Sequence, residues 1–558
     1  MAKDRPTAAY LTEEADGWRE HSWAEAATAV DELAHGLLAL GVRKSDAFAI
    51  LGSTRLEWVL FDFALALVGG VTAPIYANSS PKDCAHVVEH SEAVGILVED
   101  EAQRAKIDGL QLRHVLSFGD LEDLRARGRE HTRAHPDAVR EAADAVEEDD
   151  LFTYIYTSGT TGPPKACMIR HRNYYAMVAK IDDLDEFVVD DDVLLLYLPL
   201  AHNFGRLMHL VGPYVGYTVA FCPDPLRVGE VLPAVRPTVL PSVPRVYEKV
   251  HTAVTARFDA ETGVKRRIVR WALAVGRKVS TQRQAGRPIP LGLALQHRLA
   301  NRLVYAKVRE RLGGRFRIGV SGGAPLAKEI AELFHALDIL ILEGYGLTEC
   351  TTAATVNRPS RFRFGTVGPA LRGVELRIAE DGEVLIRSDT IFAGYYKDEA
   401  ATAEVLTEDG WLRSGDVGAL DGDGFLEITD RKKDLIVTAG GKNVSPQNLE
   451  NALKTSKYVS QALVVGDRKP YVAALITLDD GEIAGWRELG GTDVNGLVQG
   501  IVEGVNADLS RFEQIKRFTI LPRDFSTEEG EVTPTLKLKR RVCAEHFAKE
   551  IEELYRSE

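Results

Sequence analysis

Strand-like and helix-like segments alternate near the start of the chain, and this alternation constrains the fold more than any other feature of the sequence. Apolar strand-like runs at 47–51, 71–76 and 94–98 are separated by helical patterns at 56–67 and 86–90. Strands that alternate with helices in this way form a parallel sheet with helices on both faces. We therefore predict an α/β fold that begins with a largely parallel, doubly covered sheet.

Two local signals support this interpretation. Ser22 and Glu25 form a capping box, and the apolar periodicity behind them ends at Gly41, so a helix is expected between these points. The most membrane-like run, 58–76, is interrupted by Asp62, two glycines and a proline, which favours a buried helix, turn and strand over a membrane span. The N-terminal residues lack an apolar h-region, so we predict no signal peptide.

Length and composition predict more than one domain and exclude some classes of protein. A chain of 558 residues exceeds one hydrophobic core, and we divide it into 1–430 and 431–558. The net charge of −14 argues against a duplex nucleic-acid binder. The cysteines lack metal-ligand spacing and favour a reducing, cytoplasmic location; they are Cys84, Cys167, Cys222, Cys350 and Cys543.

A strand that runs into a glycine-hydroxyl loop is the strongest site signal. Residues 152–156 lead into Thr157-Ser158-Gly159-Thr160-Thr161-Gly162, and Lys165 follows two prolines. Glycines let backbone N–H groups turn toward an anion, while hydroxyls and an ammonium add donors for a polyphosphate. Only two residues separate the glycines, so the spacing does not favour a Walker loop or a P-loop kinase. A surface turn is the alternative for the hexamer alone.

Two further loops are expected beside this one. A βαβ pattern over 316–342 places the turn at 321–325 and the run at 343–349 after successive strands, and a long helical segment at 243–311 precedes it. In open α/β sheets, ligands bind beyond the carboxyl ends of strands. We therefore expect the three loops to face one crevice.

Short strands with tight turns follow residue 365, and the second of two predicted hairpins allows a geometric prediction. If Leu420 faces Phe425, antiparallel counting places Asp416 opposite Thr429, so Asp416 and Arg431 lie at the same end. A carboxylate and a guanidinium placed there suit a ribose diol. A surface ion pair is an equally economical interpretation.

The remaining residues predict a smaller α+β unit. A strand at 435–437 leads through the glycine turn Gly440-Gly441 to a helix at 446–453. Strands at 462–465 and 472–477 follow, and we expect the rest of the chain to be helical.

These motifs, in this order, resemble the adenylate-forming superfamily of acyl-CoA synthetases, nonribosomal adenylation domains and luciferases. The resemblance spans nearly the whole chain and rests on YTSGTTGPPK, SGGAP, EGYGLTE, GWLRSGD, DRKKDLI and TPTLKLKR. The runs LPLAHNF, VPRVYEKV and GGKNVSPQ are most similar to long-chain fatty acyl-CoA synthetases. The resemblance implies a large N-terminal domain of doubly wound mixed sheets with a small β-barrel-like subdomain, plus a small mobile α+β C-terminal domain.

The resemblance also implies a reaction with ATP, Mg²⁺ and CoA, in which a carboxylate is adenylated before its acyl group passes to the thiol. Glu349 would hold Mg²⁺, and Thr348 would touch the α-phosphate. The expected nucleotide residues are the loop from Thr157 to Gly162, Lys165, Gly323, Ala324, Tyr345, Gly346, Asp416 and Arg431. Core packing for Tyr345 and a surface role for Glu349 are the structural alternatives.

The family pattern of a lysine three residues before an arginine selects Lys537 over Lys539 as the catalytic lysine. A solvated basic tail is the alternative. The resemblance further implies that Lys433 is the hinge of a domain rotation and that Gly440 and Gly441 line the thiol channel.

His202 would lie between the acyl pocket and the thiol channel. Long-chain enzymes commonly read AHxxER here, but this chain has Gly205 in place of the glutamate before Arg206, a departure that affects the expected wall of the acyl tunnel. Apolar positions that either line this tunnel or pack in the core are Phe204, Met208, Leu240 and Val243.

A charge anomaly lies in the long helical segment. From Lys265 to Arg317 there are fifteen lysines and arginines and one acid, Glu310. Such a basic patch fits an anionic membrane surface or the phosphates of CoA, and an exposed basic face balanced by nearby acids is the alternative. We therefore expect a cytoplasmic protein with peripheral contact at the inner membrane surface.

Three function classes follow from these observations. The leading one is an acyl-CoA synthetase acting on a fatty or related apolar acid. The second loads the adenylate onto a carrier protein, and the third is a non-catalytic lipid-binding homologue. The residue types that argue against the third class are those at Lys165, Thr348, Glu349, Asp416, Arg431 and Lys537.

Overall fold

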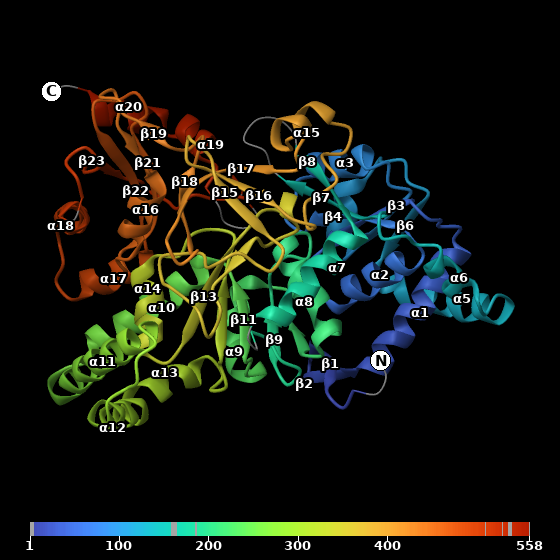
Figure 1. The fold of residues 1–558 in the computed structure, drawn as a ribbon, viewed down its shortest axis with the longest axis horizontal. Helices are drawn as coiled ribbons and strands as arrows, with labels where there is room; N and C mark the ends of the chain where they lie inside the picture. Colours follow the sequence, from blue (N-terminus) through green and yellow to red (C-terminus); the bar gives the residue numbers. More distant parts are fainter. Residues whose placement is uncertain are drawn as a thin grey trace.

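The computed structural model describes residues 5–157, 164–184, 187–507, 509–526, 528–533 and 538–556. Two large sheets organise the N-terminal part of the chain (Figure 1). In the first sheet, the neighbours from β13 to β1 are parallel, and β14 and β2 pair antiparallel at its edges. Its spatial order is β14 (Thr355–Val356), β13 (Leu340–Tyr345), β12 (Ile318–Ser321), β11 (Val239–Ser242), β9 (Val193–Leu196), β10 (Thr218–Phe221), β1 (Ala8–Glu14) and β2 (Gly17–Ser22).

The second sheet confirms the predicted parallel sheet with two covered faces. Phe48 and Ile50 of β3 belong to one apolar cluster, whereas Ala49 and Leu51 belong to another on the opposite face. Only the β7–β8 pair is antiparallel among the described pairings of this sheet. Its order is β6 (His114–Ser117), β5 (Gly95–Val98), β3 (Ala47–Gly52), β4 (Val71–Tyr76), β7 (Leu151–Thr157) and β8 (Lys165–Arg170).

Helices surround both sheets, and the first one begins at the predicted capping box. The Ser22 hydroxyl accepts the Glu25 N–H at 3.1 Å, and the Ser22 N–H donates to the Glu25 carboxylate at 2.7 Å. The membrane-like run is α2 followed by β4, as expected. The helices are α1 (Trp23–Ala39), α2 (Leu56–Leu67), α3 (Pro81–His90), α4 (Glu101–Arg104), α5 (Leu121–Ala134), α6 (Ala138–Asp144), α7 (His171–Ala179), α8 (Asn203–Val215), α9 (Val228–Val235), α14 (Lys328–Ala336) and α15 (Glu399–Val405).

A buried ion pair connects the two sheets. Arg206 of α8 donates from Nε to Asp62 of α2 at 3.1 Å and from Nη1 to Thr153 of β7 at 2.6 Å. Asp62 also accepts from Thr72 of β4 at 2.6 Å. Since α8 connects β9 with β10, this network joins the first sheet to the second through fully buried side chains.

Four antiparallel strands form the small β subdomain between the large sheets and the C-terminal unit. They are β15 (Glu375–Ile378), β16 (Glu383–Arg387), β17 (Leu412–Leu420) and β18 (Leu426–Arg431). Both predicted hairpins are confirmed, but the predicted register of the second is wrong. Leu420 pairs with Leu426, and a bulge between Val417 and Gly418 adds a residue. Asp416 therefore pairs directly with Arg431 rather than with Thr429.

The predicted helical segment at 243–311 is also confirmed. It contains α10 (Pro244–Ala260), α11 (Gly263–Gln284), α12 (Leu291–Ala300), the π-helical turn η6 (Asn301–Tyr305) and α13 (Ala306–Arg311). Within the described ranges, no helix has both the length and the apolar character needed to cross a membrane.

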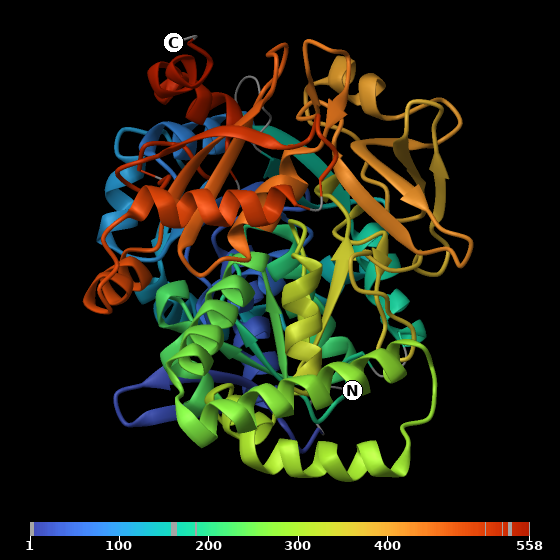
Figure 2. The same ribbon diagram turned by 90° about the vertical axis from the view of Figure 1, so that its left-hand side faces the viewer.

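The C-terminal unit packs on α10 (Figure 2). Arg245 donates to the Ser460 hydroxyl at 2.7 Å, and Lys454 forms an ion pair with Glu248 at 3.0 Å. The elements of the unit are β19 (Ile436–Val437), β20 (Asn443–Val444), α16 (Pro446–Lys454), β21 (Val459–Val465), β22 (Val472–Leu478), α17 (Asp480–Glu488), α18 (Val494–Asn506), β23 (Ile515–Ile520), α19 (Arg540–His546) and α20 (Ala548–Tyr555).

The expectation that the chain is helical after 477 is wrong at β23. This strand pairs in parallel with β22 at the edge of a three-stranded sheet. Its exposed Lys516 and Arg517 dilute the apolar pattern by which a strand is identified in sequence.

Glu343 is a buried carboxyl at the carboxyl end of the first sheet. Its Oε1 accepts the Leu326 N–H at 2.9 Å, which attaches β13 to the turn after β12. Burial raises the pKa of Glu343 to about 7, although that hydrogen bond acts in the opposite direction. In the folded protein the protonated form is therefore favoured below about pH 7.

We predict that Glu343→Gln stabilises the protein more at pH 8 than at pH 5. A raised folded pKa contributes stability that is present below the unfolded pKa and is lost as pH rises through about 7. A neutral amide avoids this loss, which amounts to about 3 kcal/mol for a shift of this size. Thermal unfolding midpoints of both proteins across this pH range test the prediction, and curves that stay parallel would contradict it.

Candidate active site

A tyrosine, an aspartate and an arginine meet where β13 approaches the β17–β18 hairpin. The Tyr345 hydroxyl donates to Asp416 Oδ2 at 2.7 Å. Arg431 Nε lies 3.6 Å from Asp416 Oδ1. The Asp416 side chain is mostly buried, whereas that of Arg431 is about half exposed at 52%. The Tyr345 hydroxyl thus holds the Asp416 carboxylate in place, while the Arg431 guanidinium remains accessible to a ligand.

Glu349 and Lys165 are brought together through Tyr395. Glu349 lies in the turn η7 (Thr348–Cys350), and its Oε1 accepts the Tyr395 hydroxyl at 2.7 Å. The Lys165 ammonium lies 5.2 Å from the centre of the same ring and 3.4 Å from Asp398 Oδ2. A carboxylate from the first sheet and a cation from the second therefore share one aromatic neighbour.

The predicted phosphate loop connects two antiparallel strands. Thr157 ends β7 and is the register partner of Lys165, which begins β8. His86 of α3 forms a hydrogen bond with the Pro164 carbonyl at 3.0 Å, directly before Lys165. The predicted residues Ser158, Gly159, Thr160, Thr161 and Gly162 lie outside the described residues.

Cys167 lies beneath this cluster on β8. It is fully buried, and burial together with the Glu349 carboxylate raises the pKa of its thiol. The other cysteines, Cys84, Cys222, Cys350 and Cys543, are also buried and free, and burial raises the pKa of each.

The turn after β12 lies against α8. A Cβ on Gly322 would lie 3.3 Å from the Phe204 ring, so the turn and the ring are in close contact. Gly323 is exposed with φ of +84°, and Ala324 is half buried beside it. The two predicted nucleotide-edge residues therefore lie on a tight glycine turn at the carboxyl end of β12.

Gly346 is required by a close approach of the backbone. A Cβ at this position would lie 2.1 Å from the Thr352 carbonyl oxygen, a distance that no side chain tolerates. The tight turn places Thr348 and Glu349 immediately after Tyr345, so the residues predicted to meet the base, the α-phosphate and the metal follow one strand end.

His202 and Gly205 begin α8. His202 Nδ1 accepts the Phe204 N–H at 3.2 Å and caps the helix. A Cβ on Gly205 would lie 2.6 Å from the Pro199 carbonyl oxygen, so a glutamate would not fit here without a backbone shift. Arg206 points into the Asp62 network, and Gly205 lies in the tightly packed first turn of α8.

Lys433 lies just beyond β18, where the C-terminal unit begins. Desolvation of its ammonium and the neighbouring Arg431 lower its pKa, while Asp434, Asp416 and Glu349 act in the opposite direction. The last two acids belong to the clusters around Tyr345 and Tyr395. The charge of Lys433 therefore interacts with the carboxylates of the candidate site.

Lys537 lies outside the described residues, but its flanks are anchored. Val532 and Leu538 form a β-bridge, and the Lys539 N–H donates to the Glu531 carbonyl at 2.7 Å. The competing candidate Lys539 precedes α19 directly. The residues on the two sides of Lys537 are therefore joined by one β-bridge.

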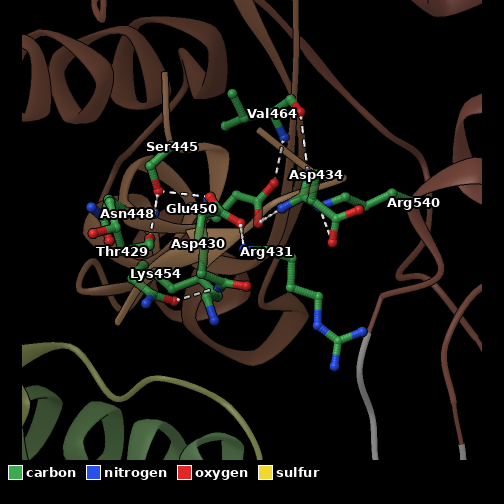
Figure 3. Close-up of polar contacts among 12 residues, drawn as sticks. Thr429, Asp430, Arg431, Asp434, Ser445, Asn448, Glu450, Lys454, Val464 and Arg540 are labelled. Atoms are coloured by element: carbon green, nitrogen blue, oxygen red, sulfur yellow. Dashed lines mark hydrogen bonds and ion pairs between the residues drawn. The ribbon is translucent and has the colours of Figure 1, made fainter. Parts of the chain in front are cut away.

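Arg540, at the start of α19, contacts residues of α16, β21 and the turn after β18 (Figure 3). It donates to Glu450 Oε2 at 2.5 Å and to the Val464 carbonyl at 3.3 Å, and its Nε lies 4.0 Å from Asp434. Nearby, Ser445 donates to Asp430 at 2.7 Å. The start of α19, helix α16 and the residues at the end of β18 thus form one polar cluster.

The Gly440–Gly441 turn is exposed between β19 and β20. Gly441 has φ of +71°, and its N–H donates to the Thr438 carbonyl at 2.8 Å. The Ala439 N–H donates to the Lys469 carbonyl at 2.9 Å. These bonds stay within the C-terminal unit, so over the described ranges no hydrogen bond joins the turn to Tyr345 or Asp416.

Tyr395 is a residue of the candidate site that was not predicted from the sequence. The structure brings together Lys165, Tyr345, Glu349, Asp416 and Arg431, and Tyr395 is the side chain that links the first and third of these. No motif in the sequence marks Tyr395, since its contacts with Glu349 and Lys165 arise only in the folded chain.

The Glu349 carboxylate suits a Mg²⁺ ion that is also bound by the oxygens of a phosphate ligand. In the part of the chain that the structure describes, no group of three or more His, Cys, Asp or Glu side chains could hold a metal ion. Glu349 offers one half-buried carboxylate, and Mg²⁺ typically takes one or two carboxylates and completes its shell with phosphate oxygens and water.

Family models match nearly the whole chain. A model described as AMP-binding enzyme matches residues 1–396, and one described as AMP-binding enzyme C-terminal domain matches residues 433–558. Long-chain-fatty-acid–CoA ligase FadD15 of Mycobacterium tuberculosis is 39% identical over 97% of this chain and 93% of its own length. Long-chain-fatty-acid–CoA ligase ACSBG2 of Homo sapiens is 30% identical over 94% and 86%, respectively.

Solved structures share the fold at lower identity. The adenylation domain of a carboxylate reductase from Mycobacterium chelonae has a TM-score of 0.78 and 23% identity over 98% of this chain and 89% of its own. The anthranilate CoA ligase AuaEII in complex with anthranoyl-AMP has a TM-score of 0.72 and 19% identity over 97% and 94%.

We predict that Tyr395→Phe weakens the use of Mg²⁺ and ATP by about tenfold in KM, because the Tyr395 hydroxyl holds the Glu349 carboxylate in the orientation that a bound metal needs. The phenyl ring keeps its place beside Lys165 while the donor to Glu349 is lost. Pyrophosphate release measured at varied Mg²⁺ tests this. Tyr396→Phe is the matched control, since its hydroxyl contacts Glu92 at the surface; equal effects of both variants would refute the role of Tyr395.

Proposed function

Because the chain belongs to the family of AMP-binding enzymes, we propose that it acts as a long-chain acyl-CoA synthetase. It adenylates a fatty acid with ATP and then transfers the acyl group to CoA. The observation that carries this function is the assembly of five predicted residues into two neighbouring polar clusters. Tyr345 and Arg431 meet at Asp416, and Glu349 and Lys165 meet at Tyr395.

In the first step, a carboxylate oxygen of the fatty acid attacks the α-phosphorus of ATP, and the bond to pyrophosphate breaks. Asp416 and Arg431 would hold the ribose hydroxyls, and Tyr345 would face the adenine, with Gly323, Ala324 and Gly346 at its edge. Thr348 would donate to the α-phosphate. The loop from Thr157 to Gly162 and Lys165 would bind the leaving pyrophosphate.

Mg²⁺, held by Glu349 and phosphate oxygens, would neutralise charge on the phosphates. Tyr395 orients the Glu349 carboxylate by its hydrogen bond of 2.7 Å. Lys537 would donate to the carboxylate and the α-phosphate from the C-terminal domain.

In the second step, the sulfur of CoA attacks the acyl carbon, and AMP leaves with the anhydride oxygen. We propose domains at 1–430 and 431–558 that rotate about Lys433, so that Lys537 departs and Gly440 and Gly441 line the thiol channel. The contacts of Arg245 and Lys454 across the two parts would have to exchange in this rotation.

The acyl chain would bind beside α8. His202 would lie between the acyl pocket and the thiol channel, and the partly buried Phe204 and Val243 and the buried Met208 and Leu240 offer apolar surface. The basic segment 265–317 would meet an anionic lipid surface, where such acids reside. The curated relatives are named as CoA ligases, so carrier-protein loading and non-catalytic lipid binding are not favoured.

We expect AMP and pyrophosphate to be released with long apolar acids, and thioester to form only when CoA is added. A panel of acids from short to long chain, with and without CoA, tests this in one assay. ADP as the product would indicate a kinase instead. Failure of ATP–pyrophosphate exchange with every acid would contradict the proposed function.

We predict that Lys537→Ala lowers adenylation by about 10²- to 10³-fold, because one preorganised donor to the transition state is lost. Conversion of a supplied acyl adenylate to thioester should be retained. Lys539→Ala is the matched control and should keep both half-reactions. Equal loss of both half-reactions in Lys537→Ala would exclude the assigned role.

A further inference from the structure

A continuous helical run forms the outermost layer of the long helical segment. It consists of α12, η6 and α13, and its inner side packs on α11. Ala300, Val304 and Tyr305 are buried, and the Tyr305 hydroxyl donates to the Ala272 carbonyl of α11 at 2.5 Å. The run is therefore a fixed part of the fold and presents a defined outer face.

The outer face of this run carries an exposed leucine ridge. Leu291, Leu295, Leu299 and Leu303 are 86%, 65%, 51% and 38% exposed, respectively. They recur every four residues and so lie along one side of the helix. Single exposed leucines are common, but four in one row are the pattern of an interaction surface.

Basic residues share this face and surround it. Arg298 and Arg302 alternate with the leucines and are exposed. Asp338 engages Arg283 at 2.7 Å and Arg309 at 3.7 Å. Within the described ranges, no carboxylate lies within ion-pair distance of Arg266, Arg267, Arg270, Arg277, Lys278, Arg287, Arg298, Arg302, Lys307 or Arg311.

We propose that this leucine ridge inserts into the surface of an anionic lipid bilayer while the surrounding lysines and arginines bind the headgroups. A helix with apolar side chains flanked by basic ones lies in the plane of the membrane–water interface. It binds through burial of its apolar area and through attraction of its basic side chains to anionic headgroups. The inference rests on the proposed function, because a bilayer is where long-chain acids reside, and it names the element that meets the membrane.

Charge argues against a second copy of the chain as the occupant. Two ridges packed together would bring Arg298 and Arg302 of each copy against those of the other, and like charges at an apolar contact are unfavourable. A bilayer with anionic headgroups supplies the opposite charge.

The location of the ridge is compatible with domain rotation. In both views α11 and α12 lie at the opposite end of the molecule from α19 and α20 (Figures 1 and 2). A membrane at the ridge therefore leaves the C-terminal part exposed to the aqueous side.

Flotation of the full-length protein with vesicles tests the proposal. We expect binding to vesicles of phosphatidylcholine and phosphatidylglycerol (3:1), and at least tenfold weaker partitioning to phosphatidylcholine alone. Replacing the four leucines with glutamine, or Arg298→Glu with Arg302→Glu, should each lower binding at least tenfold. Leu226→Gln with Leu489→Gln is the matched control, because these leucines are 85% and 91% exposed elsewhere.

Insertion is measured separately from adhesion. All five native cysteines are buried, so Leu295→Cys provides a single site for an environment-sensitive fluorophore. A blue shift with anionic vesicles supports insertion, and an unchanged spectrum overturns it. The proposal would be overturned if the leucine change left vesicle binding unaffected or if free CoA displaced the protein from vesicles. It would also be overturned if replacing the four leucines lowered the oligomeric mass of the protein in solution.

Failure of this proposal is distinguishable from failure of the proposed function. The ridge variants should retain ATP–pyrophosphate exchange with a detergent-dispersed acid, since the ridge holds none of the cleft residues. Loss of vesicle binding with exchange intact locates the defect at the membrane. Absence of exchange in the unmodified protein, with vesicle binding intact, would reject the enzymatic function alone.

Discussion

The relative position of the two large sheets, and with it the grouping of Lys165, Tyr345 and Glu349, depends on the buried contact between Arg206 and Asp62. Lys165 begins a strand of one sheet, whereas Tyr345 ends a strand of the other and Glu349 follows it. Two sheets that were free to shift would not keep these groups within reach of one ATP molecule. Removing one partner of a buried ion pair typically costs about 3–5 kcal/mol, because the other charge is left uncompensated. The absence of a side chain at Gly205 allows the first turn of the helix that carries Arg206 to pack against the Leu198 and Pro199 carbonyls.

Much of the fold could be predicted from local patterns. The parallel sheet that contains β3, β4 and β5, the capped helix and both hairpins have strong periodicity or turn signals, and the structure contains all of them. The register of the second hairpin could not be predicted by counting, because the turn residues give no sign of the bulge between Val417 and Gly418. The strand β23 was missed for a related reason, since its partner β22 lies far back in the sequence.

The candidate site was predictable in part. Asp416 and Arg431 were placed at one end of a hairpin from sequence, and the pairing found in the structure is closer than that count suggested. Tyr395 was not found, because its role comes from lying between Glu349 and Lys165, which are far apart in the sequence. The roles of Lys537, Lys433 and Gly440 remain predictions, since they concern a motion that one arrangement of the chain does not display.

Burial of the cysteines has a consequence for the selectivity of the reaction. An acyl adenylate is a mixed anhydride that any accessible thiolate can attack, and Cys167 lies directly beneath the cleft in which it would form. Because its thiol is buried against the Glu349 carboxylate and its pKa is raised, the protein offers no competing thiolate of its own at that point. The activated acyl group is thereby reserved for a thiol that arrives from solution.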